Sequence, residues 1–110
     1  MKPDTQESPL VCNMGVFTAA ERERHVRATF RLIQSVQDVQ AAENGFRFVF
    51  PNESRTITGL AEFISNERRC CPFLEFTLKI APNDRPISLL LTGPKGTQEF
   101  LREELSEAFQ

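Results

Sequence analysis

Hydrophobic residues recur along the chain at two spacings, one typical of helices and the other typical of strands. After Thr18 they recur at helical spacing in a segment rich in Glu, Arg and Ala, which predicts a helix from about Ala19 to Ser35. Thr18 and Glu21 have the spacing of a capping box and define its start. We expect a core-facing stripe with His25 at its edge, formed by Val26, Thr29, Phe30, Ile33 and Val36.

Alternating apolar and polar residues predict two β-hairpins. The first joins residues 36–42 to residues 46–50 through Asn44-Gly45, a strong signal for a two-residue turn in which both residues adopt positive φ. The second joins residues 76–80 to residues 87–91 through a polar turn with a proline at each end.

Two more helices complete the pattern. Ser54 to Arg69 carries apolar residues on one face, and Pro72 ends this helix because the residue before a proline is driven out of the helical region. The last helix follows Gly96 and has an apolar stripe of Phe100, Leu101, Leu105 and Ala108. The order α-ββα-ββα predicts an α+β fold, a two-layer sandwich whose four-stranded, mainly antiparallel sheet is covered by helices. The strand order does not follow from the pattern.

Length and charge narrow the class of protein. A chain of 110 residues suits one domain, and we expect a disordered lead at 1–10 before a single α+β domain at 11–110. The net charge of −2 weighs against a nucleic-acid partner. Neither a signal peptide nor an apolar run long enough to span a membrane is present, so we expect a cytoplasmic protein without a membrane partner.

The adjacent thiols of Cys70 and Cys71, just before Pro72, are the most distinctive feature. Three cysteines, two of them adjacent, do not resemble a secreted disulfide scaffold, so we expect reduced thiols. Adjacent Cα atoms lie about 3.8 Å apart, closer than an unstrained disulfide prefers, so a Cys70–Cys71 bond is not expected. Both thiols follow the predicted helix, where the dipole does not favour thiolate, which favours a role other than enzyme catalysis.

Metal binding needs no preformed thiolate, because the metal itself drives deprotonation. The candidate ligands are Cys12, Cys70, Cys71, His25 and Glu67. Thiolates and imidazole select zinc or another thiophilic metal. The alternative is a ligand-binding or protein-interaction module, dimerising through surplus apolar surface, in which the cysteines only pack in the core. The residues leave both interpretations open, and the expected partners are a second copy of the chain and a metal ion or small effector.

Several motifs resemble a small uncharacterised bacterial family over residues 10–105. The motifs are Glu67 to Phe76, with Cys-Cys-Pro-Phe inside it, and Leu91 to Gly96, with Leu-Thr-Gly-Pro-x-Gly. Cys12 to Met14 and Glu21 to His25 are also similar to that family. Some of its members are fused to MerR-type regulators, so the resemblance implies sensing or binding of a soft metal or another thiol-reactive effector. This chain has no such DNA-binding region.

Overall fold

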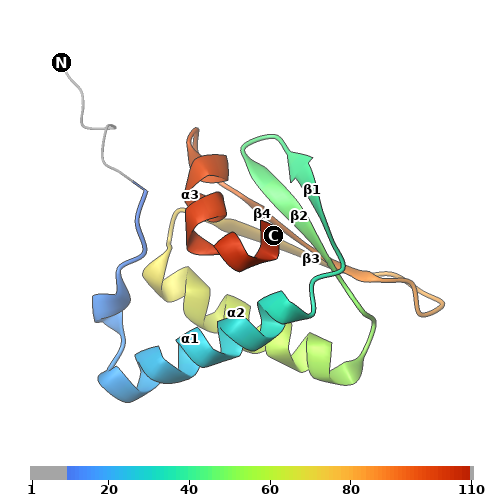
Figure 1. Ribbon diagram of the computed structural model, residues 1–110, viewed down its shortest axis with the longest axis horizontal. Coiled ribbons are helices and arrows are strands. Elements are labelled where there is room, and N and C mark those ends of the chain that lie inside the picture. The colour runs from blue at the N-terminus through green and yellow to red at the C-terminus, as the bar shows by residue number, and fades with distance from the viewer. Residues whose placement is uncertain (1–9, 110) are drawn as a thin grey trace.

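The computed structural model describes residues 10–109, and within them the chain forms three α-helices and one four-stranded sheet (Figure 1). The elements are α1 (Ala19–Gln34), β1 (Asp38–Ala42), β2 (Gly45–Phe50), α2 (Ser54–Cys70), β3 (Glu75–Ile80), β4 (Ile87–Thr92) and α3 (Thr97–Glu104), with short 3-10 helices η2 (Met14–Val16) and η3 (Ser106–Phe109). This order confirms the predicted α+β fold and its α-ββα-ββα arrangement. Of the predicted lead, residues 1–9 lie outside the described part of the chain.

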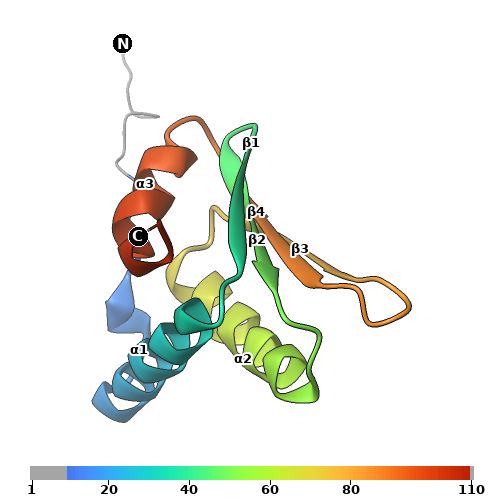
Figure 2. The same ribbon diagram turned by 45° about the vertical axis from the view of Figure 1, so that its right-hand side comes forward.

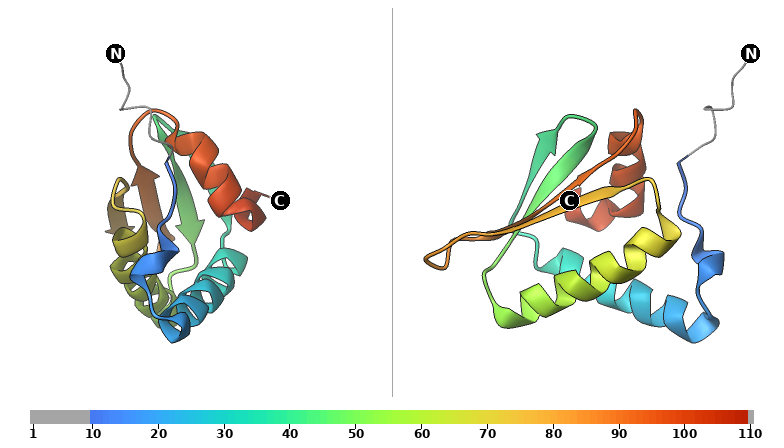
Figure 3. Two further views of the ribbon diagram at one scale, coloured as in Figure 1. Left: turned by 90° about the vertical axis from the view of Figure 1, so that its left-hand side faces the viewer. Right: turned by 180° about the vertical axis from the view of Figure 1, so that it is seen from behind.

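The sheet has the strand order β1-β2-β4-β3, and every neighbouring pair is antiparallel. The side chains on one face of the two central strands are buried, namely Phe46, Phe48, Phe50, Ile87, Leu89 and Leu91. The helices lie on this side of the sheet, and no described helix covers the other face (Figures 2 and 3). The strand alternation therefore builds the two-layer sandwich that the sequence predicts.

The first hairpin turns one residue earlier than predicted. Ala42 pairs with Gly45, so the turn residues are Glu43 and Asn44, and Asn44 has a φ of 55°. Gly45 belongs to β2 instead, where a Cβ atom would overlap the Leu91 carbonyl of the neighbouring strand. The glycine is therefore needed for close strand approach, and asparagine supplies the left-handed turn residue.

Helix α1 starts at the predicted capping box, in which Thr18 and Glu21 each accept a hydrogen bond from the other's backbone N–H. The predicted core stripe is rotated, because Val26 and Phe30 are half exposed while His25 is buried. The buried face of α1 packs against α2, where a Cβ on Gly59 would lie 3.7 Å from a methyl group of Leu32. Contact with α2, rather than apolar periodicity, therefore sets the orientation of α1.

Helices α2 and α3 end where their local sequences change. Cys71 follows α2 with a φ of −125° and a ψ of 70°, outside the helical region, as expected for the residue before Pro72. Helix α3 ends at Glu104, before the end of the predicted stripe, and the chain continues as η3, which packs Phe109 against Phe46 with ring centroids 4.8 Å apart. Among residues 10–109 no helix combines the length and the apolar composition needed to cross a bilayer.

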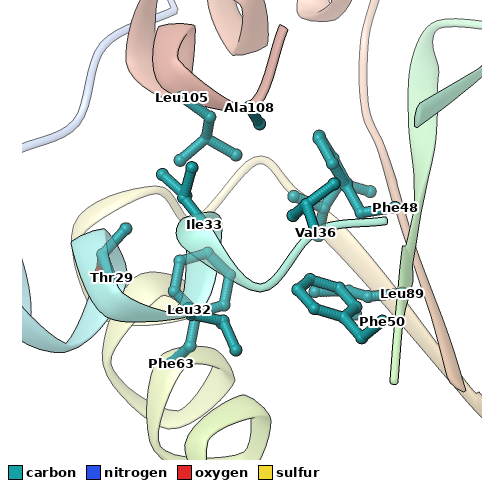
Figure 4. Close-up of a pocket in the computed structure, with 11 residues that line it drawn as sticks. Thr29, Leu32, Ile33, Val36, Phe48, Phe50, Phe63, Leu89, Leu105 and Ala108 are labelled. Carbon is teal, nitrogen blue, oxygen red and sulfur yellow. The ribbon is translucent and has the colours of Figure 1, made fainter. Parts of the chain in front are cut away.

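A small cavity of ≈ 20 Å³ lies between α1, α2, the sheet and the chain after α3 (Figure 4). Its lining is apolar except for Thr29, whose hydroxyl is buried and has no hydrogen-bond partner among the described residues. This volume holds one water molecule at most, and a water needs two or more polar partners to be held there. The cavity is therefore a packing defect beside Thr29, too small for an organic ligand.

Candidate metal centre

The candidate site lies where the C-terminal end of α2 meets the segment before η2. Asn13 donates its backbone N–H to the carbonyl of Cys70 over 2.7 Å, which places Cys12 beside the last turn of α2. The Asn13 side chain also accepts from the N–H of Gly15 and caps η2. Two segments far apart in the sequence are thus joined by backbone contacts next to the cysteines.

Helix α2 directs Glu67, Cys70 and Cys71 to the same place. Residues three and four apart share a helix face, and the Cys71 N–H still donates to the Glu67 carbonyl, over 2.8 Å, so that the helical turn extends through Cys71. All three residues are almost fully buried, at 3%, 0% and 0% exposure. Cys12, the fourth member of the group, is partly buried, so the site is enclosed on the α2 side.

The ligand atoms of Cys12, Glu67, Cys70 and Cys71 all lie within 4.8 Å of one another. The sulfurs of Cys12, Cys70 and Cys71 lie 3.8, 3.7 and 3.4 Å from the nearer carboxylate oxygen of Glu67. The two adjacent sulfurs are 3.7 Å apart. In a tetrahedral zinc site, bonds of about 2.3 Å to sulfur and 2.0–2.2 Å to oxygen place neighbouring ligand atoms roughly 3.5–3.8 Å apart. The sulfurs of Cys12 and Cys71 approach the same oxygen, Oε2, whereas Cys70 approaches Oε1. With Oε2 as the ligand atom, three of the six distances are close to the size that a tetrahedral metal requires, and the four groups lie close enough to hold an ion.

Cys12 and Cys71 are joined by a disulfide, with Cα atoms 4.8 Å apart, and Cys70 is a free thiol. The expectation of three reduced thiols is therefore wrong for this structure. It failed because cysteine spacing does not reveal that residues 59 positions apart meet in the fold. The expectation that Cys70 and Cys71 do not bond to each other is confirmed.

His25 supports Glu67 rather than joining the ligand group. Its Nε2 atom lies 2.8 Å from Oε1 of Glu67, and both side chains are only 4% exposed. The imidazole ring lies between Phe17 and Phe63, at centroid distances of 5.3 and 6.0 Å, and its Nδ1 atom has no partner among the described residues. The contact occupies Nε2 and fixes the orientation of the carboxylate, so His25 is a positioning residue here.

The electrostatic surroundings keep the free thiol protonated. Burial, followed by the negative charge of Glu67, raises the pKa of Cys70 from 9.0 to about 12. Glu104, on α3, adds a smaller effect of the same sign, and partial desolvation together with the charge of Glu67 raises its own pKa. Without a cation, Cys70 is therefore a poor nucleophile near neutral pH.

The structure adds residues that the sequence did not single out. The charge of Glu104 raises the pKa of Cys70, and that of Glu67 raises the pKa of Glu104, although the position of Glu104 on α3 resembles that of any surface carboxylate. Phe17 packs on one side of His25 and has Arg69 at 4.8 Å from its ring centroid. No sequence motif marks either residue, because the role of each depends on how distant segments of the chain pack together.

Comparison of the chain with protein-family models, curated proteins and solved structures gave no significant match. The geometry of the site is therefore the basis for inferring a function.

Proposed function

We propose that the reduced protein binds one zinc or similar thiophilic ion through Cys12, Glu67, Cys70 and Cys71. The supporting observation is that the sulfurs of Cys12 and Cys71 lie 3.8 and 3.4 Å from Oε2 of Glu67 and the sulfurs of Cys70 and Cys71 lie 3.7 Å apart, close to the edges of a tetrahedron around zinc. Three thiolates and one carboxylate are ligand types that zinc accepts, and thiolates discriminate against magnesium and calcium. Four protein ligands, three of them buried, are typical of a structural or sensing site, because a catalytic zinc keeps one position open.

The disulfide and the metal are alternative occupants of the same sulfurs. A disulfide bond holds two sulfurs about 2 Å apart, whereas a tetrahedral zinc needs them roughly 3.8 Å apart and both as thiolates. A dithiol reductant converts the Cys12–Cys71 disulfide into two thiols and becomes a cyclic disulfide itself. Zinc then replaces the thiol protons, which are released to solvent. Metal uptake therefore requires prior reduction.

The contact between His25 and Glu67 supports this arrangement. The carboxylate has only weak sulfur donors on the cysteine side, and the imidazole holds one of its oxygens from the other element. Partners of metal ligands commonly orient them in this way, and removing such a partner lowers affinity about 10–100-fold. His25 therefore keeps Glu67 directed at the sulfurs.

Zinc stoichiometry in the two redox states tests the proposal. The full chain is reduced with a phosphine that does not bind zinc strongly, loaded with zinc, desalted and analysed for metal and thiol content. We expect one zinc per reduced chain and none in the disulfide form. Cobalt(II) in place of zinc should give the intense visible bands of a tetrahedral thiolate site.

The Cys70→Ser, Cys71→Ser double variant should lose the metal while keeping its circular dichroism spectrum. Glu62→Gln is a matched control, because Glu62 is an exposed carboxylate on the same helix. A folded, fully reduced wild type that takes up no zinc overturns the proposal. Full zinc retention by the double-serine variant does so as well.

A second candidate role is purely structural, and the disulfide itself favours it. The Cys12–Cys71 bond ties the segment before α1 to the end of α2, and such a link stabilises a small domain by restricting its unfolded chain. In that case the cysteines stabilise a protein-interaction module. Reduction of the disulfide then lowers the stability of the fold without creating a zinc site. The same measurement of zinc content in the reduced chain separates the two roles.

A further inference from the structure

Strand β3 is an open edge of the sheet. It pairs only with β4 among the described strands, and five of its six residues are exposed. Figures 1 and 2 show the β3–β4 hairpin projecting beyond the helices. The outer backbone groups of this strand are therefore accessible to another strand.

The side chains of β3 on the core side of the sheet are apolar, but two of them are exposed to solvent. Leu78 pairs with Leu89 and Ile80 pairs with Ile87, so their side chains lie on the face that carries the core. Leu89 and Ile87 are fully buried, whereas Leu78 and Ile80 are 36% and 49% exposed. The helices thus leave the end of this apolar face uncovered.

The charges on the other face of β3 are complementary to those of a second copy. Two copies of β3 can pair antiparallel about a two-fold axis. Their core faces then lie on the same side of the joined sheet only when one residue lies opposite its own copy. With Thr77 on the axis, Glu75 lies opposite Lys79 of the partner subunit, and Lys79 lies opposite the partner subunit's Glu75. The same register places Phe76 opposite the partner's Leu78 and Ile80 opposite the partner's Leu74. This register thus forms both ion pairs and the contacts between Phe76 and Leu78, while Leu74 precedes β3 and is buried in its own chain.

No other edge of the described sheet offers this match. In β1, a two-fold axis at Gln40 places Asp38 opposite Ala42 of the partner subunit, without a basic residue. In β3, an axis at Leu78 leaves Glu75 opposite Ala81 of the partner subunit and Lys79 opposite a threonine. Neither Glu75 nor Lys79 forms an ion pair within residues 10–109, so both charges are free to engage a partner.

We propose that two copies of this chain form a homodimer through antiparallel pairing of β3 with β3, with Thr77 on the two-fold axis. The pairing extends the four-stranded sheets into one eight-stranded sheet and covers Leu78 and Ile80 in both copies. It does not depend on the metal site, because β3 carries none of the four ligands.

Charge reversal tests both the interface and its register. Lys79→Glu places Glu75 opposite a glutamate of the partner, and Glu75→Lys places Lys79 opposite a lysine. Each variant should raise the dimer dissociation constant roughly tenfold or more, since cross-strand pairs of like charge are destabilising. Dissociation constants are measured by sedimentation equilibrium on the full chain with its disulfide intact.

Two restorations identify the proposed register. The Glu75→Lys, Lys79→Glu double variant should recover the wild-type dissociation constant. An equimolar mixture of the two single variants should form a heterodimer, because both cross-strand pairs are then of opposite charge. Lys95→Glu, which makes the same charge change on an exposed turn after β4, should leave dimerisation unchanged.

Monomeric wild type at several hundred micromolar overturns the proposal. So does a dimer that the single charge reversals do not weaken, or one that the double variant and the mixture fail to restore. Circular dichroism and thermal unfolding of each variant establish that the comparison is between folded proteins.

Discussion

The imidazole of His25 and the carboxylate of Glu67 form a buried contact of 2.8 Å that joins α1 to α2 directly behind three sulfurs. One oxygen of Glu67 contacts the imidazole, and the other lies 3.4 Å from the sulfur of Cys71. The carboxylate therefore links the contact between the two helices to the cysteine cluster. Substitutions in the contact between the two helices should therefore affect the cysteine cluster, and substitutions in the cluster should affect the helix contact.

Glu67→Gln should weaken zinc binding by the reduced protein about 10–100-fold, because it replaces an anionic ligand by a neutral amide of the same shape. Competition with a chromogenic chelator measures the affinity. Glu62→Gln should leave it unchanged. Equal affinities for the Glu67→Gln variant and the wild type would show that the carboxylate does not contact the metal.

His25→Ala should lower the free energy of unfolding by about 1–3 kcal/mol, because it leaves the buried Glu67 without its partner. Urea denaturation of the disulfide form measures this. Arg27→Ala is the comparison, since it removes the exposed pair between Arg27 and Glu23 at 2.9 Å, which should contribute under about 1 kcal/mol. Combining His25→Ala with Glu67→Gln should cost less than the sum of the two changes, and additivity would contradict the coupling.

Reduction of the Cys12–Cys71 disulfide should destabilise the metal-free protein by about 2–4 kcal/mol. Zinc at one hundred times its dissociation constant should then restore about 2.7 kcal/mol, because it binds the folded state. Thermal or urea unfolding with and without zinc measures both effects. The disulfide form and the reduced Cys12→Ser variant should gain less from zinc than the reduced wild type, and equal gains would point to binding elsewhere.

Alkaline pH should lower the free energy of unfolding of the disulfide form, because the Cys70 thiol ionises more readily in the unfolded chain. The folded state raises the pKa of this thiol from 9.0 to about 12, so it retains the proton where the unfolded chain has lost it. The resulting stability is present in full below pH 9 and decreases as the pH rises from 9 towards 12. Urea midpoints between pH 8 and pH 10.5 should decline more steeply for the wild type than for Cys70→Ala, and parallel declines would assign the effect to other groups.

The sequence predicts most of the local structure because local signals determine it. The capping box at Thr18 starts α1, and Pro72 ends α2, as expected. The strand order is not predictable, since any apolar strand can pair with any other. The orientation of α1 was also missed, because periodicity treats Phe30 as a core residue and gives no weight to the partner that His25 finds on α2.

The candidate site is only partly visible in the sequence. Cys70, Cys71 and Glu67 share one helical turn, which spacing alone predicts. The approach of Cys12 depends on the chain before α1 crossing the end of α2, and no residue pattern indicates this crossing. His25 is close to the site as expected, although it contacts Glu67 and lies outside the ligand group.

The backbone hydrogen bond from Asn13 to Cys70 does not involve sulfur, so we expect it to persist whichever oxidation state the thiols adopt. When the disulfide is cleaved, the Cys12 thiol should remain beside α2 instead of diffusing away with a loose chain end. A zinc ion would then encounter donors that are already gathered, with little ordering of the chain left to offset its binding energy. We therefore expect this one peptide hydrogen bond to preorganise the proposed zinc site in the reduced protein.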